Sequence, residues 1–156
     1  MKKQHHYTIA MTWTGNNGKG TQDYSSYSRS HTIYAENKPA LECSSDSAFR
    51  GDTTKYNPEE LLVASLSGCH MLWYLHLCAD SGIIVIAYTD NAKGIMQENA
   101  DGSGEFQQVT LYPQVTVLHN SMKEKAMALH AQAHHLCFIA RSVRFPVLHE
   151  PTISVN

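Results

Sequence analysis

The chain has 156 residues, and its 12 basic and 14 acidic residues leave a formal net charge of −2 at pH 7. This length predicts a single domain over residues 1–156 with a hydrophobic core of its own. The nearly balanced charge excludes a nucleic-acid-binding protein that works through a basic surface.

The first third of the chain is predicted to consist of strands and loops. Residues 7–14 alternate between polar and apolar side chains, which is typical of a strand, and residues 15–20 form a turn rich in Asn and Gly. Residues 21–35 are consistent with one or two returning strands. Residues 36–56 lack a periodic pattern and predict a long loop, which contains Arg50.

A long helix is predicted from Asn57 to Gly82. Asn57 is a favourable N-cap, Pro58 suits the first helical position, and Glu59 complements the positive end of the helix dipole. Gly82 readily adopts the left-handed conformation that ends many helices. Residues 61–79 contain no Asp, Glu, Lys or Arg, and Cys69 lies in the middle of this run.

This helix is too long and too apolar for the surface of one small domain, because about 26 residues span about 39 Å. A membrane span needs about 20 mostly apolar residues. Here His70 and His76 interrupt the apolar run, and no basic cluster flanks it. We therefore interpret it as a central helix that is buried on all sides, in part by a second subunit, with no membrane partner.

The second half returns to strand-like patterns. Residues 83–96 and 105–118 are rich in β-branched and aromatic side chains, and residues 97–104 form a hairpin loop between them. Residues 143–155 predict a strand pair or an extended tail interrupted by two prolines.

A second helix is predicted over residues 121–141 from apolar residues at steps of three and four. Ser121 and Glu124 have the spacing of a capping box. The order of strands, long helix, strands, helix and strand predicts an α+β fold.

The chain has four cysteines without a CxxC spacing: Cys43, Cys69, Cys78 and Cys137. The segment before the first strand is not a signal peptide, so we expect a cytoplasmic location, where such cysteines are free or redox-active thiols. Because an unperturbed thiol is mostly protonated at neutral pH, a reactive Cys69 needs a nearby cation, and Arg50 and Arg29 are the candidates. A buried cysteine that only fills core space is the alternative.

A metal site is a second hypothesis. His130, His134 and Cys137 follow one another at i, i+4 and i+7, on one face of the predicted helix, and zinc accepts such ligands. Histidines placed near a helix end by the dipole are the simpler interpretation. A serine hydrolase is disfavoured, since Ser67 lies inside a helix and not on a strand-to-helix turn.

The motifs around the two cysteines resemble the OsmC/Ohr family (osmotically inducible protein C and organic hydroperoxide resistance proteins). The resemblance rests on Asn57-Pro58-Glu59-Glu60-Leu61-Leu62, on Cys69 ten positions after Glu59, and on Ala133-His134-His135-Leu136-Cys137. It covers most of the chain, from Trp13 to the last strand, and the residues around both cysteines indicate an OsmC-like branch. The family fold has antiparallel sheets around two central cysteine-bearing helices.

The resemblance implies a thiol-dependent peroxidase without a cofactor. Cys69 would be the peroxidatic cysteine and Cys137 the resolving one, and Glu59 would orient an arginine, with Arg50 preferred over Arg29. A proline commonly follows the second cysteine in the family, whereas this chain has Phe138.

The same resemblance implies an intertwined homodimer, an organic hydroperoxide as substrate, and an external thiol or dithiol as reductant. An apolar lining from Leu66, Met71, Trp73 and Phe138 would favour organic hydroperoxides over hydrogen peroxide. A non-catalytic OsmC-like dimer that binds a small apolar ligand remains an alternative.

Helix geometry adds an expectation about the dimer. Glu59 and Cys69 are ten residues apart on one helix, which is about 15 Å along the axis and beyond the reach of a glutamate side chain. Two copies of the helix packed antiparallel about a two-fold axis would bring Glu59 of one chain toward Cys69 of the other.

Overall fold

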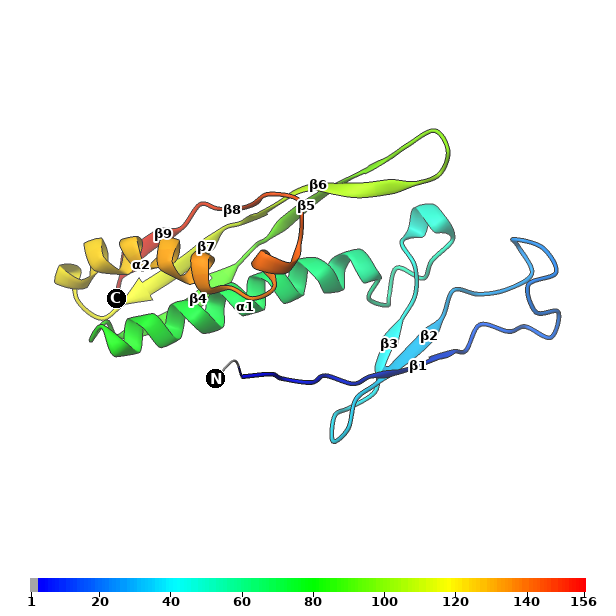
Figure 1. Ribbon diagram of the computed structural model, residues 1–156, viewed down its shortest axis with the longest axis horizontal. Coiled ribbons are helices and arrows are strands. Elements are labelled where there is room, and N and C mark those ends of the chain that lie inside the picture. Colours follow the sequence, from blue (N-terminus) through cyan, green and yellow to red (C-terminus); the bar gives the residue numbers. More distant parts are fainter. Residues whose placement is uncertain (1–2) are drawn as a thin grey trace. The chain divides into compact units, whose positions relative to one another are not determined.

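Two structural units divide the chain in the computed structural model, which describes residues 3–156. The first unit ends at Leu61, and the second comprises Leu62–Asn156. Helix α1 (Pro58–Asp80) begins at the end of the first unit and continues into the second (Figure 1).

The first unit contains a three-stranded antiparallel sheet in the order β1-β2-β3. Its strands are β1 (Ala10–Trp13), β2 (His31–Tyr34) and β3 (Leu41–Cys43), and a short 3-10 helix, η1 (Ser47–Phe49), follows. The strands are shorter than the sequence predicts, because a loop with its own hydrogen bonds occupies residues 14–30. The Trp13 indole N–H, for example, donates to the Ser28 carbonyl at 2.8 Å.

The predicted start and end of α1 are confirmed. The Glu60 backbone N–H donates to Asn57 Oδ1 at 2.7 Å, and the Asn57 N–H donates to Glu60 Oε2 at 3.1 Å. This reciprocal pair is a capping box, and it satisfies two backbone donors at the helix start. At the other end Gly82 has a φ of +71°, and the Ile83 N–H donates to the Cys78 carbonyl at 2.9 Å.

The second unit has two three-stranded sheets, in the orders β4-β7-β9 and β5-β6-β8. Their strands are β4 (Val85–Asp90), β5 (Lys93–Glu98), β6 (Gly104–Leu111), β7 (Pro113–Val117), β8 (Val147–His149) and β9 (Thr152–Val155). Strand pairs β4–β7 and β5–β6 are antiparallel, whereas β7–β9 and β6–β8 are parallel. The sheets are therefore mixed, and not antiparallel throughout as the family resemblance implied.

The second helix, α2 (Lys123–Leu136), is shorter than predicted. A 3-10 turn, η2 (Asn120–Met122), leads into it, so Met122 occupies the N-cap and no side chain caps the helix. The predicted capping box is therefore wrong. At the other end Cys137 has extended backbone angles (φ −65°, ψ 109°), so it follows α2 and does not lie on it. A further 3-10 turn, η3 (Ala140–Ser142), comes next.

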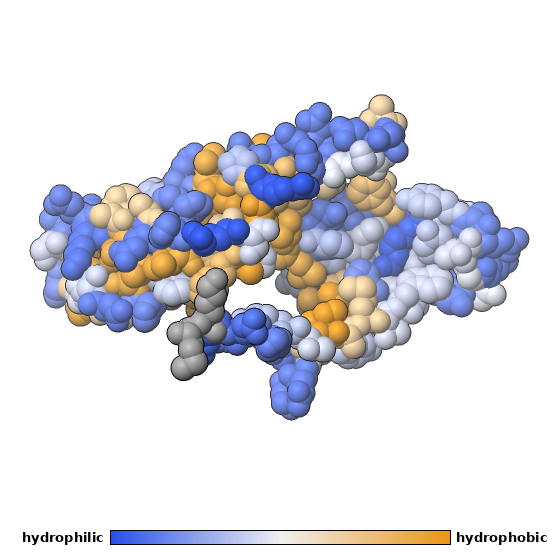
Figure 2. Space-filling model, in the orientation of Figure 1, coloured by the Kyte–Doolittle hydropathy of each residue, from blue (hydrophilic) through white to orange (hydrophobic). Residues whose placement is uncertain are grey.

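One face of α1 forms much of the core of the second unit. Tyr74, Leu77 and Cys78 pack in one cluster with residues of β7 and α2, and Leu66 packs in another with β6 and β8. The opposite face is open, and Leu72 is 65% exposed. Hydrophobic residues also reach the visible surface over α1 and α2 (Figure 2). The chain's own elements thus leave one face of α1 uncovered, as expected for so long and apolar a helix in one small domain.

By length and composition, α1 also meets the criteria for a membrane-spanning helix, and among residues 3–156 it alone does so. A core helix of a soluble protein passes the same test.

Candidate functional site

The two cysteines singled out by the sequence meet in the second unit. Cys69, in the middle of α1, is partly exposed, whereas Cys137, directly after α2, is buried. Burial raises the pKa of Cys137 to about 11, and the neighbouring Cys69 thiol adds to this effect, while a hydrogen bond from the Ala140 N–H to Cys137 Sγ at 3.4 Å opposes it. At neutral pH Cys137 is therefore a protonated thiol beside a more accessible one.

Local hydrogen bonds hold Cys137 in this position. Its N–H donates to the His134 carbonyl at 3.3 Å, and its carbonyl accepts from the Arg141 N–H at 3.1 Å. The Ser142 hydroxyl donates to the Phe138 carbonyl at 2.7 Å. The segment after α2 is thus a tight turn and not a continued helix.

The other two cysteines have different surroundings. Cys43 ends β3 in the first unit, and Cys78 lies nine residues after Cys69 on α1. Both are buried, and burial raises the pKa of each thiol. They are core thiols without a neighbouring cysteine among residues 3–156.

An aromatic pair lies one helical turn from the thiols. Trp73 follows Cys69 by four residues, and its ring meets that of Phe138 edge to face, with centroids 5.5 Å apart and planes at 89°. A shallow hollow of about 250 Å³ lies beside Trp73, lined also by Leu72 and His76.

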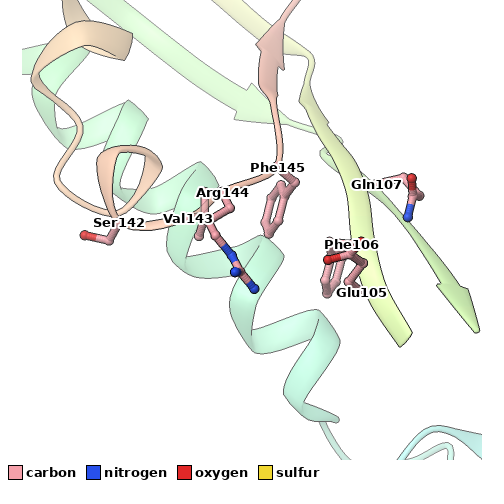
Figure 3. Close-up of a pocket in the computed structure, with 7 residues that line it drawn as sticks. All are labelled: Glu105, Phe106, Gln107, Ser142, Val143, Arg144 and Phe145. Atoms are coloured by element: carbon pink, nitrogen blue, oxygen red, sulfur yellow. The ribbon is translucent and has the colours of Figure 1, made fainter. Parts of the chain in front are cut away.

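The exposure of Phe138 and Leu66 corrects part of the apolar lining that the sequence predicts. Phe138 is 63% exposed, whereas Leu66 is fully buried in the core and cannot contact a ligand. A larger pocket of about 470 Å³ lies elsewhere, between β6 and the segment after η3 (Figure 3). None of the predicted site residues lines it; its lining is Glu105, Phe106, Gln107, Ser142, Val143, Arg144 and Phe145.

Arg29 is held firmly within the first unit. Its guanidinium donates to the Tyr27 carbonyl at 2.6 Å and to the Tyr24 carbonyl at 2.8 Å. It also lies over both tyrosine rings, 4.1 and 4.2 Å from their centroids. Such contacts hold the cation in one orientation, and three of its five N–H donors have no hydrogen-bond partner among the described residues 3–156.

Arg50 and Glu59 complete the set of predicted site residues. Arg50 is exposed and ends η1 with a left-handed backbone (φ +64°). Glu59 Oε2 is buried and has no hydrogen-bond partner among residues 3–156. Within the first unit, neither Arg29 nor Arg50 forms an ion pair with Glu59.

Comparison with known proteins identifies the family of the chain. The family profile described as "OsmC-like protein" matches residues 51–151. The chain belongs to the OsmC-like family. The resemblance seen in the cysteine motifs is therefore confirmed, together with the α+β fold class.

Solved structures share the fold of this OsmC-like protein over nearly its whole length. An OsmC-like protein of unknown function from Vibrio cholerae is 32% identical, has a TM-score of 0.86, and covers 96% of this chain and 100% of its own. An organic hydroperoxide resistance protein from Elizabethkingia anophelis is 20% identical, with a TM-score of 0.71 and 100% of both chains covered. One from Legionella pneumophila is 17% identical, with a TM-score of 0.69, and covers 98% and 99%. Curated proteins give no significant match.

A buried histidine cluster, which the sequence did not predict, connects the helices of this OsmC-like protein. His70 on α1 and His130 on α2 are each 1% exposed, and His70 Nε2 lies 3.0 Å from His130 Nδ1. The His149 ring lies 5.6 Å from that of His70 and 5.3 Å from that of His134, and Tyr74 stacks on His130 at 3.9 Å.

The cluster is not a metal site in this structure. Among residues 3–156 no group of three or more His, Cys, Asp or Glu side chains is arranged to hold a metal ion. The three residues of the predicted set, His130, His134 and Cys137, do not lie on one helix, because α2 ends at Leu136 and Cys137 has extended backbone angles. Residues at i, i+4 and i+7 share one face only if the helix continues through all three positions. Here α2 ends before the third position.

Burial keeps the central histidines neutral. It lowers the pKa of His70 to about 4 and that of His130 to about 3, and the neighbouring imidazoles contribute in the same direction. In an unfolded chain both would titrate near 6.5. The unfolded state therefore binds more protons between about pH 3 and pH 6.5, and the stability of the fold must rise with pH across this range.

Acidification to pH 5 is accordingly expected to destabilise the protein. We expect the free energy of unfolding to fall by about 2 kcal/mol for each of His70 and His130 between pH 7 and pH 5. Urea unfolding at the two pH values measures the difference. In His70→Gln one titrating group is removed, so the difference should shrink. An unchanged difference in that variant would assign the pH dependence to other groups.

Proposed function

We propose that this OsmC-like protein is a thiol-dependent peroxidase that reduces organic hydroperoxides to alcohols. The observation that carries the proposal is the pairing of a partly exposed Cys69 with a buried, protonated Cys137. An accessible first thiol can meet a substrate, and a protected second thiol can react only with the product formed on its neighbour.

The reaction balances with these two residues and a reductant. The Cys69 thiolate attacks the distal oxygen of ROOH, so that an S–O bond forms, the O–O bond breaks, and ROH leaves with one added proton. The Cys137 thiol then attacks the Cys69 sulfenic acid, giving a Cys69–Cys137 disulfide and water. An external thiol or dithiol reduces the disulfide by exchange. The disulfide prevents further oxidation of Cys69.

The aromatic pair beside the thiols supports an organic substrate. Trp73 and Phe138 place apolar surface one turn from Cys69. The hydrocarbon group of an organic hydroperoxide would cover this surface, whereas hydrogen peroxide has no such group. Burial of apolar surface contributes about 25 cal/mol per Å², so even a small hydrocarbon group on ROOH would gain affinity.

We propose a homodimer in which each site draws residues from both chains. The open face of α1, where Leu72 is 65% exposed, offers a large apolar surface for a second copy. The buried Glu59 Oε2 has no partner within the described chain, and an unpaired buried carboxylate oxygen is costly. An arginine that reaches Glu59 in the assembled site would satisfy it.

Arg29 is the better candidate for this arginine. Its guanidinium is already ordered by two carbonyls and two aromatic rings, and its remaining donors can bind a carboxylate and stabilise a thiolate. Arg50 is exposed, so ordering its side chain would cost conformational entropy. We therefore propose Arg29 as the activating residue, in place of the Arg50 favoured by the sequence.

Peptide mapping after oxidation tests the proposed chemistry. One equivalent of cumene hydroperoxide should produce a Cys69–Cys137 crosslink, and hydrogen peroxide under the same conditions should produce it more slowly. A Cys69–Cys78 bridge is not expected, because nine residues along α1 separate these thiols by about 13 Å. A dominant 69–78 bridge, or unreacted thiols, would refute the mechanism and favour a non-catalytic dimer that binds a small apolar ligand.

A further inference from the structure

The two helices that position the thiols are joined by a buried hydrogen bond. His70 on α1 is the residue after Cys69, and His130 on α2 lies seven residues before Cys137. His70 Nε2 and His130 Nδ1 are 3.0 Å apart, and the planes of the two rings differ by only 5°. One imidazole N–H thus points directly at the lone pair of the other.

This contact is a specific one between the two helices. Tyr74 of α1 also stacks on the His130 ring at 3.9 Å, and the remaining residues that the two helices contribute to this part of the core are Leu77, Cys78, Ala126, Leu129 and Ala133. Apolar contacts tolerate small shifts of one helix along the other, whereas a hydrogen bond between fully buried imidazoles holds only one register. Its loss would leave two more buried polar atoms without partners.

We propose that His70 and His130 are positioning residues that set α2 on α1 and thereby hold Cys137 against Cys69. They act through the helices and do not touch a substrate. The proposal rests on the role assigned to the thiol pair and adds the contact that brings the pair together.

The short segment from α2 to Cys137 is the second link between the histidine pair and the Cys137 thiol. His134, one turn after His130, accepts the Cys137 N–H at 3.3 Å, so the end of α2 directly fixes the backbone of Cys137. A shift of α2 by part of a turn would therefore move Cys137 Sγ away from Cys69, since a disulfide tolerates a Cα separation of only about 4.4–6.8 Å.

A glutathione equilibrium measures this positioning without any hydroperoxide. In the reaction one glutathione disulfide oxidises the Cys69 and Cys137 thiols and becomes two glutathione thiols, so the equilibrium constant reports how well the fold holds the two thiols together. In His70→Leu and His130→Leu we expect this constant to fall at least tenfold, which raises the reduction potential by about 30 mV.

Matched variants separate positioning from general destabilisation. His70→Gln and His130→Asn each retain an amide atom close to the ring nitrogen used in the contact, and should stay within about threefold of the wild-type constant. Leu129→Ala creates a core cavity on α2 that destabilises the fold while leaving the histidine pair intact, and should also keep the wild-type constant. If a leucine variant does not fold, His70→Asn, whose amide falls short of His130, takes its place and should show the same tenfold loss.

Wild-type constants in the leucine variants, or in His70→Asn, would overturn the proposal, as would an equal fall in Leu129→Ala. The result is also distinct from a failure of the proposed function. A wild-type protein that forms the 69–137 disulfide with glutathione but does not react with hydroperoxides would refute the peroxidase and leave the positioning role intact.

Discussion

Arg29→Ala is expected to slow the reaction of Cys69 at pH 7 by about eightfold to thirtyfold, because an unperturbed thiol with a pKa of about 8.5 is still about 3% thiolate at this pH. A close guanidinium favours a thiolate over the thiol by one to three powers of ten, and the ordered Arg29 is the cation best prepared to do so. The rate of alkylation of Cys69 by iodoacetamide, followed by peptide mapping, measures its thiolate without assuming any peroxidase activity.

Two other substitutions serve as controls for this effect. Arg50→Ala should react like the wild type, because Arg50 is exposed and ends η1. Arg29→Lys should be intermediate, since lysine keeps the charge and loses the planar contacts with the two tyrosine rings. A large loss in Arg50→Ala with a normal Arg29→Ala would return the role to Arg50, and wild-type rates in both would remove the activating cation from the mechanism.

Mixing two inactive homodimers is expected to restore activity. Cys69→Ser removes the nucleophile, and Glu59→Ala removes the carboxylate that orients the arginine, so each homodimer should lose activity. If the two copies of α1 pack antiparallel, a heterodimer contains one site with neither substitution. Refolding the two variants together should therefore yield about one active site in each heterodimer, measured as cumene hydroperoxide reduction.

The control for this experiment is an isolated heterodimer, purified through a different affinity tag on each chain, in which one chain carries both substitutions and the other is wild type. If each site draws on both chains, both sites of that heterodimer carry one substitution and it should be inactive. Activity there, together with none in the first mixture, would show that Glu59 and Cys69 serve the same chain. A monomer that stays folded and active on dilution in light scattering would refute the dimer itself.

Several features of this OsmC-like protein could be predicted from local sequence. The caps of α1 depend on residues within one or two turns of its ends, and both Asn57 and Gly82 behave as expected. The strand-rich regions were also predicted, because β-branched alternation is a local property. The points at which one strand ends and the next begins could not be predicted in this way. The break between β6 and β7 is stabilised by Asp90 Oδ1, which accepts the Tyr112 N–H at 2.7 Å from 22 residues away.

The sequence by itself determined the central helix, the α+β class and the family, since these depend on neighbouring residues and on motifs readable along the chain. Only the tertiary structure decided that α2 ends before Cys137 and that His70 meets His130 across 60 positions. A hydrogen bond between two buried imidazoles leaves no periodic trace in the sequence, because each histidine alone is compatible with a surface helix. Its partner is defined only when the hydrophobic faces of α1 and α2 are packed together and water is excluded from between them.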